Sequence, residues 1–224
     1  MALANVAALL AEWGKRILII DWDLEAPGIE RYFEHPPSRL FGSRSDSPGL
    51  IDLICAYVAN QKLDWRSCLI TAYPFNTLRS VAILTAGQDT PNYVSRVQNL
   101  DWEQFFGERQ FGIYLEELRE EWIAEFDFVF IDSRTGITDV GGICTIYLPD
   151  VLVLLFTTNK QSLNGTIDVM NRARRARKNL PFDRTYLLGV PIPARDESRT
   201  EYELALEWRK ILTFPLCCFD QISC

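Results

Sequence analysis

The stretch Ile17-Leu-Ile-Ile-Asp-Trp-Asp-Leu-Glu-Ala-Pro-Gly28 decides the fold class of this 224-residue chain. Residues 17–20 form an unbroken apolar run, which is typical of a parallel strand covered on both faces. The strand delivers two carboxylates, Asp21 and Asp23, to its C-terminal end, where ligands bind in open α/β sheets. Residues i and i+2 of a strand point to the same side, so both carboxylates are able to serve one cation or one water. An Asp that only caps the following turn fits the bare Asp-x-Asp pattern equally well.

Short apolar runs of the same kind recur along the chain, and helical patterns stand between them. The further predicted strands are 81–84, 128–131, 151–155 and 186–190. The predicted helices are 2–14, 49–60, 101–125, 161–179 and 198–212. Strands that alternate with helices indicate βαβ units. We therefore expect an α/β fold of three layers, with a mainly parallel sheet and helices on both faces.

The domain organisation follows from the absence of repeats and of low-complexity linkers. Residues 34–49 are rich in Pro, Ser, Gly and Arg, which predicts a surface loop. Three of the six cysteines crowd into the last eight residues, where the regular amphipathic pattern has ended. We predict one domain over residues 1–212, followed by an irregular tail over residues 213–224.

A second motif, Phe126-Asp-Phe-Val-Phe-Ile-Asp-Ser-Arg-Thr-Gly136, again places an Asp after a buried strand. An apolar strand that ends in Asp132 has the form of a Walker B strand, whose carboxylate helps to hold Mg²⁺ beside nucleotide phosphates. Gly136 and the pair Gly141-Gly142 give the following loop the backbone freedom to respond to a bound phosphate.

Together the two motifs resemble the ParA/MinD family of P-loop ATPases, in particular a bacterial branch whose phosphate loop reads K-G-G-V-G-R-S. The resemblance extends over residues 1–212. It rests on the helix 2–14, on the two motifs, and on the later stretches Leu148–Asp150, Phe156–Ser162 and Val190–Arg195.

The resemblance implies a molecular switch that binds and hydrolyses ATP with Mg²⁺. In such a switch Asp23 would position the attacking water, and Asp21 and Asp132 would lie at the metal. The loop after the last core strand, Pro191 to Arg195, would lie near the adenine, with Pro193 and Arg195 as the residues beside it. The partners implied are the nucleotide, and a second copy of the chain or a protein effector.

The family's phosphate loop is not within the 224 residues, because the spacing to the Asp-x-Asp pair places its last residue immediately before Met1. Backbone amides of that loop do most of the phosphate binding. The first strand is therefore also expected upstream of Met1. In the family this strand lies beside the Walker B strand, so we expect a break in the sheet next to residues 128–131.

Composition limits the other function classes. The formal net charge of −7 argues against nucleic-acid binding over the whole surface. A basic run over residues 171–178 is predicted to be a solvated helix face, with DNA binding as the alternative. The six cysteines show no Cys-x-x-Cys pair and only one His accompanies them, which favours reduced thiols in a cytoplasmic protein over zinc or disulfides. No apolar run approaches the roughly 20 residues that span a bilayer.

Two alternatives to an ATPase remain on the sequence alone. Haloacid dehalogenase-type phosphatases also open with a strand and Asp-x-Asp, but they require a following Thr or Val, whereas Leu24-Glu25 stand here. The other alternative is not an enzyme: a fragment or protein-interaction scaffold that has lost nucleotide binding.

Overall fold

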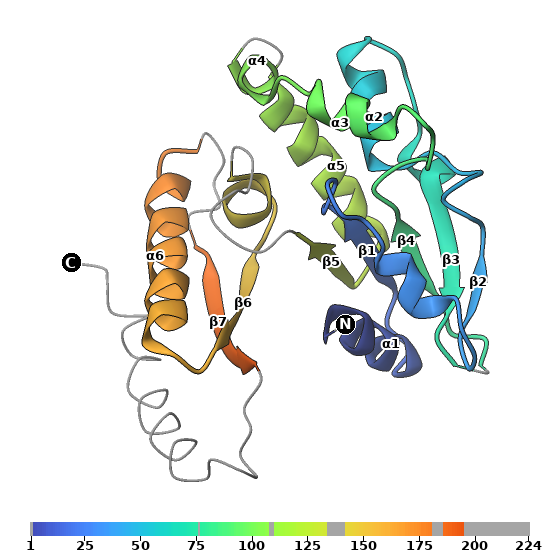
Figure 1. The fold of residues 1–224 in the computed structure, drawn as a ribbon, viewed down its shortest axis with the longest axis horizontal. Helices are drawn as coiled ribbons and strands as arrows, with labels where there is room; N and C mark the ends of the chain where they lie inside the picture. The colour runs from blue at the N-terminus through green and yellow to red at the C-terminus, as the bar shows by residue number, and fades with distance from the viewer. Residues whose placement is uncertain (1, 76, 108–109, 134–141, 181–185, 195–224) are drawn as a thin grey trace, which may run out of the picture. The chain divides into compact units, whose positions relative to one another are not determined.

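The computed structural model of the chain describes residues 2–75, 77–107, 110–133, 142–180 and 186–194 (Figure 1). The chain divides into two compact units, Met1–Cys144 and Thr145–Cys224. The first unit contains a five-stranded sheet and the second a two-stranded sheet. The single domain over residues 1–212 stays a prediction.

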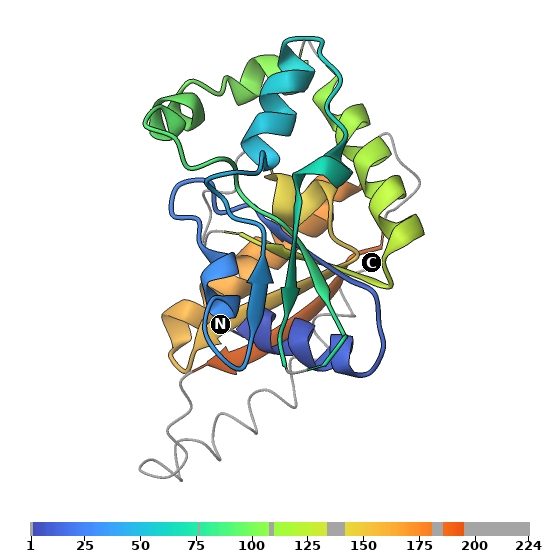
Figure 2. The same ribbon diagram turned by 90° about the vertical axis from the view of Figure 1, so that its right-hand side faces the viewer.

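The strand order of the first sheet is β2-β3-β4-β1-β5, with the strands labelled in Figure 1 and the same ribbon seen from another side in Figure 2. Its strands are β1 (Ile17–Asp21), β2 (Arg39–Phe41), β3 (Leu69–Tyr73), β4 (Val81–Leu84) and β5 (Phe128–Asp132). Strand β1 pairs in parallel with β4 and β5, whereas β3 pairs antiparallel with β2 and β4. In the second unit β6 (Val151–Thr157) pairs in parallel with β7 (Leu188–Ala194). The expected α/β class with a mainly parallel sheet is therefore confirmed.

Strand β1 forms the centre of the first unit, and all five of its residues are buried. Helix α1 (Ala2–Glu12) covers one face of the sheet, where its small side chains pack against Ile17 and Ile19. The alanines on that face are Ala4, Ala7 and Ala11. Leu18 and Ile20 point to the other face and are also fully buried. Both faces of β1 are thus covered, as its continuous apolar run predicts.

Strand β5 is an edge of the first sheet in the described part of the chain. Strand β1 pairs with one side of it, and no described strand pairs with the other. Phe128, its first residue, is exposed. Among the described strands, β6 and β7 pair only with each other. The break expected next to residues 128–131 stays a prediction.

Five further helices and three shorter turns are described. These are α2 (Leu50–Val58), α3 (Tyr93–Gln98), α4 (Trp102–Gly107), α5 (Phe111–Glu125), α6 (Lys160–Arg177), the 3₁₀ helices η1 (Ile29–Phe33) and η2 (Trp65–Cys68), and the π-helical turn η4 (Ile143–Tyr147). Among the helices of the described ranges, none combines the length and apolar character needed to cross a membrane. The predicted helix over residues 198–212 lies outside the described residues.

Two predictions of local structure are wrong. The single helix predicted over residues 101–125 is two helices, because Gln110 has a left-handed backbone (φ 53°) that a right-handed helix cannot continue. The surface loop predicted over residues 34–49 contains strand β2. That strand has only three residues, too few to show an alternating pattern in the sequence.

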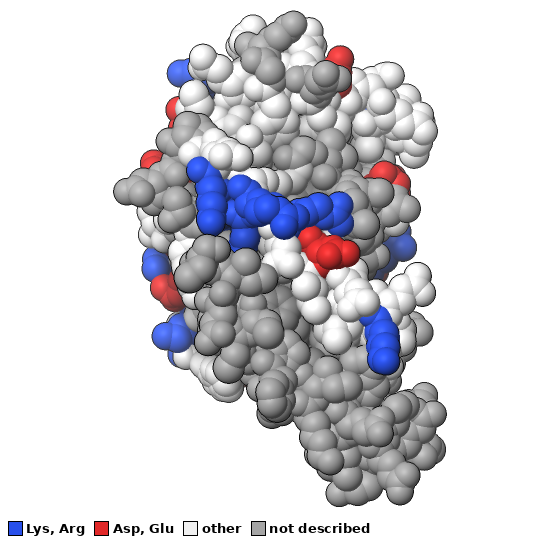
Figure 3. Space-filling model, turned by 90° about the vertical axis from the view of Figure 1, so that its left-hand side faces the viewer, with Lys and Arg blue, Asp and Glu red and all other residues white. Residues whose placement is uncertain are grey.

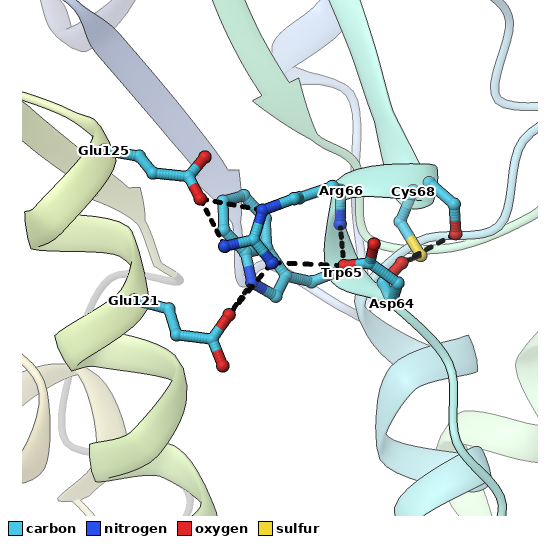
Figure 4. Close-up of polar contacts among 7 residues, drawn as sticks. Asp64, Trp65, Arg66, Cys68, Glu121 and Glu125 are labelled. Carbon is cyan, nitrogen blue, oxygen red and sulfur yellow. Dashed lines mark hydrogen bonds and ion pairs between the residues drawn. The ribbon is translucent and has the colours of Figure 1, made fainter.

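A polar network joins η2 to helix α5 (Figure 4). The Arg66 guanidinium contacts the carboxylates of Asp64, Glu121 and Glu125, and its carbon Cζ lies 4.5 Å from the centre of the Trp65 ring. The Trp65 indole N–H donates to Glu121 over 2.9 Å. The side chain of Arg66 is 44 % exposed, so the network is solvated and is worth little per pair at ordinary salt.

Helix α6 covers one face of the two-stranded sheet in the second unit. Met170 and Ala173 pack against Leu152 and Leu187. Arg177 is the last residue of α6 and is 1 % exposed. Its Nη1 donates to the backbone carbonyls of Ile146 and Pro149. Arg177 therefore ties the C-terminal end of α6 to the chain that leads into β6.

Candidate functional site

The two Asp-bearing motifs meet at one edge of the first sheet. Asp21 and Asp132 are register partners at the ends of the parallel strands β1 and β5. The ladder continues one step further, because the backbone N–H of Trp22 donates to the carbonyl of Asp132 over 2.8 Å. Asp21, Asp23 and Asp132 therefore all lie at the C-terminal edge of the sheet, as the parallel-strand rule predicts.

Asp21 orders the loop that follows β1. One of its carboxylate oxygens accepts the backbone N–H groups of Gly28 and Ile29 over 2.9 and 3.3 Å, and the other accepts that of Asp23 over 3.2 Å. Burial raises the pKa of Asp21 to about 6; the N–H groups of Gly28 and Ile29 oppose the rise, and the negative charge of Glu30 adds to it. Three backbone donors on one buried carboxylate fix the course of residues 22–29.

Asp23 lies within this loop and is more accessible than Asp21. Its Oδ1 accepts the backbone N–H of Ala26 over 3.1 Å, which closes a local turn. The structure therefore shows the turn-capping contacts that the bare Asp-x-Asp pattern allowed. Among the described residues, no hydrogen bond ties the second carboxylate oxygen of Asp23 to the loop. The residue is half-buried. An accessible carboxylate beside a buried one is able to orient a water.

Two residues that the sequence did not single out support the loop. The Tyr93 hydroxyl donates to the carbonyl of Leu24 over 2.9 Å. The Arg44 guanidinium lies over the Tyr93 ring at 4.6 Å and donates from Nε to the carbonyl of Gly87, in the chain that follows β4. Burial raises the pKa of Tyr93 to about 12, so the hydroxyl keeps its proton as a donor. The sequence gives no signal for this contact, because 69 residues separate Tyr93 from Leu24.

Asp132 is the less enclosed carboxylate of the register pair. It is half-buried; burial raises its pKa, and the negative charge of Asp23 raises it further. Within the described ranges, no three Asp, Glu, His or Cys side chains come close enough together to enclose a metal ion. Mg²⁺ prefers oxygen ligands and keeps several waters, and it commonly binds through one or two carboxylates and the phosphates of its substrate. The carboxylates at this edge fit that mode of binding and do not form a complete protein cage.

The structure describes one of the two residues predicted to lie near the adenine, and the adenine contact itself stays a prediction. Pro193 is half-buried and belongs to β7, where it is the register partner of Phe156. The loop that we predicted to follow the strand at residues 191–195 is thus strand as far as Ala194, and prolines are tolerated because β7 is an edge strand of the described sheet. Arg195 lies outside the described residues, as does the predicted loop segment that contains Gly136 and Gly141.

The basic run is a feature of the second unit. Figure 3 shows Lys and Arg gathered over the C-terminal part of α6. Arg172, Arg175 and Lys178 are exposed there, at a spacing that puts them on one side of the helix. Arg177, in contrast, is buried. The prediction of a solvated helix face is therefore confirmed for Arg172, Arg175 and Lys178 and is wrong for Arg177.

Comparison with known proteins supports the fold and goes no further. No protein-family model and no curated protein matches the sequence. The kinase domain of the Escherichia coli tyrosine kinase ETK is similar to this chain, with 14 % identity, a TM-score of 0.51, and coverage of 87 % of this chain and 63 % of that one. A plasmid partition protein from Borrelia burgdorferi is similar with 17 % identity, a TM-score of 0.50, and coverage of 93 % and 90 %. A ParA family ATPase from Chlorobium tepidum has 13 % identity and a TM-score of 0.46 over 91 % of this chain.

Proposed function

We propose that the chain is the body of a nucleotide-hydrolysing switch of the ParA/MinD kind. One observation carries the proposal: Asp21 and Asp132 are register partners at the C-terminal edge of adjacent parallel strands, with Asp23 two residues beyond Asp21. That edge is where α/β folds of this class bind ligands. The fold shared with the partition protein and the kinase domain is consistent with the proposal.

Each carboxylate has a different role in the proposal. Asp23 orients the water that attacks the γ-phosphate, because it is accessible and sits on an ordered loop. Asp132 would help to hold Mg²⁺ through water, and Asp21 would lie beside the metal while it holds the loop. Mg²⁺ would supply charge neutralisation between the β- and γ-phosphates. Pro193 and Arg195 border the adenine.

The proposed function requires a phosphate-binding loop, which the family's spacing would place directly before α1. Its strand would pair with the open side of β5, next to the Walker B position. Backbone amides at the N-terminus of α1 and in that loop would then cradle the phosphates. The test therefore compares residues 1–224 with a chain extended by the codons that precede Met1.

In the extended chain we expect Mg²⁺-dependent ATP binding and slow hydrolysis, and weak or no binding by residues 1–224. Asp23→Ala should keep nucleotide affinity and lose turnover, because positioning a water matters only in the transition state. Asp132→Ala should weaken the Mg²⁺ dependence of binding itself. Isothermal titration and phosphate release on the same preparations measure both effects.

Asp127→Ala is the matched control, because Asp127 directly precedes β5, at the end of the strand opposite to Asp132, and is paired with Arg16. It should leave both affinity and turnover unchanged. Full turnover in Asp23→Ala, or tight ATP binding by residues 1–224, contradicts the proposal. Failure of the extended chain to bind nucleotide would favour the non-catalytic scaffold.

A further inference from the structure

The chain that follows β4 is bound firmly to helix α2. The carbonyl of Thr85 accepts the first backbone N–H of α2 over 2.8 Å, and the carbonyl of Ala86 accepts the second over 2.9 Å. Asp52, in the first turn of α2, accepts the backbone N–H of Gln88 over 3.1 Å and an N–H of the Arg96 side chain over 2.7 Å. Helix α3, which contains Arg96, therefore lies beside α2 (Figure 1). The chain between β4 and the end of α3 is thus cross-linked to α2.

Tyr93, the first residue of α3, is held in place within this region and is 6 % exposed. The Arg44 guanidinium covers its ring, with Cζ 4.6 Å from the ring centre. Arg44 is fixed in turn, because its Nε donates to the carbonyl of Gly87 over 2.6 Å and its own carbonyl accepts the backbone N–H of Asp89 over 3.1 Å. The ring is therefore carried by residues 85–96, which we term the β4–α3 segment, and is covered by a side chain bonded to the same segment.

The Tyr93 hydroxyl reaches from the β4–α3 segment to the loop that contains Asp23. It donates to the carbonyl of Leu24, the residue after Asp23, over 2.9 Å. The N–H of Leu24 donates to the carbonyl of Trp22 over 2.9 Å, so both backbone polar groups of Leu24 are bonded. Among the described residues, no other group donates to the Leu24 carbonyl, and Leu24 is buried. Without the hydroxyl, this carbonyl would lose its hydrogen bond and the loop would lose its link to the β4–α3 segment.

We propose that Tyr93 is a positioning residue for turnover: through the carbonyl of Leu24, its hydroxyl holds Asp23 where that carboxylate orients the attacking water. The inference rests on the proposed function and adds the residue that fixes Asp23. Asp21, at the end of β1, holds the backbone N–H of Asp23, and Tyr93, on α3, holds the residue that follows. The backbone on each side of Asp23 is therefore bonded to a different element of the first unit. Such support matters because a displacement of about 1 Å at a reacting centre costs on the order of 100-fold in rate.

Tyr93→Phe separates this role from packing, because it keeps the ring beneath Arg44 and removes only the hydroxyl. In the extended chain we expect kcat to fall about tenfold or more while KM for ATP changes less than about twofold, since the water is positioned only in the transition state. Tyr32→Phe is the matched control: Tyr32 follows the same loop but is 50 % exposed, and its variant should keep the wild-type kcat. A wild-type kcat in Tyr93→Phe would overturn the proposal.

The same substitution in the Asp23→Ala background tests whether the hydroxyl acts through Asp23. There Tyr93→Phe should lower kcat no further, because no carboxylate is left to position and residues that act as a unit are not additive. A purely structural role would lower kcat by the same factor in both backgrounds. A loss of equal size in the Asp23→Ala background would therefore contradict the proposal.

A measurement on residues 1–224 without nucleotide does not depend on the proposed function. In Tyr93→Phe, amide hydrogen exchange over residues 22–29 should be severalfold faster than in the wild type or in Tyr32→Phe, while exchange over β1 should be unchanged. Failure of the extended wild-type chain to hydrolyse ATP would refute the proposed function and with it the role in turnover. Unchanged exchange over residues 22–29 would instead refute the support of the loop by Tyr93, whatever the activity.

Discussion

Strands β1 and β6 are both apolar runs that end near polar residues, yet their surroundings differ. Strand β1 has parallel neighbours on both sides and is buried at every position. Strand β6 has only β7 beside it among the described strands, and its side chains alternate between exposed and covered. The sequences alone look alike, because both read as continuous hydrophobic runs.

The difference shows how much of a parallel strand's stability comes from elements distant in sequence. β1 is completed by α1, β4 and β5, all within the first unit. Within the second unit, β6 is covered on one face by α6. Substitutions of the same type in the two units should therefore have different effects, which the following experiments measure.

The largest effect is expected from Ile19→Ala in β1. Ile19 is fully buried between α1 and the neighbouring strands, so its truncation removes apolar contact and leaves a cavity. We expect a loss of about 2–5 kcal/mol in the free energy of unfolding. Ile123→Ala, at a 48 % exposed position of α5, should change it by about 0.5 kcal/mol or less. Urea denaturation of both variants checks the contrast, and equal losses would contradict it.

The second-largest loss of stability is expected from Arg177→Met, a substitution in the second unit. The substitution keeps most of the aliphatic volume but leaves the partly buried carbonyls of Ile146 and Pro149 without this donor. We expect a loss of about 1–3 kcal/mol in the free energy of unfolding. The control is Arg175→Met on the exposed side of the same helix, which should be close to neutral. A neutral Arg177→Met would show that these carbonyls find other donors.

Arg66→Met, in the first unit, should have a smaller effect that depends on salt. Arg66 contacts three carboxylates at an exposed site, where ions in solution screen the attraction (Figure 4). Thermal unfolding midpoints at low and high NaCl should show the destabilisation shrinking as salt rises. Arg177 is buried and donates to uncharged backbone carbonyls, with one longer contact of 3.9 Å to the Asp150 carboxylate. A parallel salt series on Arg177→Met, which should show a smaller dependence, is the control.

The smallest effect is expected from Asp127→Asn, and it should depend on pH. The Arg16 side chain, which bonds the Asp127 carboxylate, lowers the pKa of that carboxyl to about 2. Because the unfolded chain binds this proton more tightly than the folded one, the contribution to stability is present above about pH 4 and is lost as pH falls toward 2. Midpoints of wild type and variant should therefore converge on acidification. A constant difference from pH 7 to pH 2 would contradict the assignment.

The central elements were predictable because each depends on its own residues. The apolar run of β1 and the register of its Asp with Asp132 follow from strand length and parallel pairing. Strand β2 was not predictable, because three residues are too few to show the alternating pattern of a strand. The helix end at Gln110 was not predictable either, because no sequence pattern marks a Gln with a left-handed backbone. Pro191 and Pro193 indicated a loop, yet an edge strand has no need of their missing N–H groups.

The candidate site was predictable in its residue types and less so in their contacts. The sequence places Asp21 and Asp23 at the end of a strand. It does not show that the following chain folds back, so that the backbone N–H of Gly28 donates to the Asp21 carboxylate seven residues earlier. Nor does it show the support that Tyr93 and Arg44 give from beyond β4. Such contacts depend on tertiary packing between segments far apart in sequence.

The loop over residues 22–29 has a consequence for the order in which a ligand site forms. Successive N–H groups that converge on an anion form a nest, and in phosphate loops the anion arrives with the ligand. Here the chain supplies its own anion, the carboxylate of Asp21, which already occupies the donors of Asp23, Gly28 and Ile29. The backbone around Asp23 is therefore organised in the ligand-free protein, and binding has no loop-ordering entropy to offset at this position.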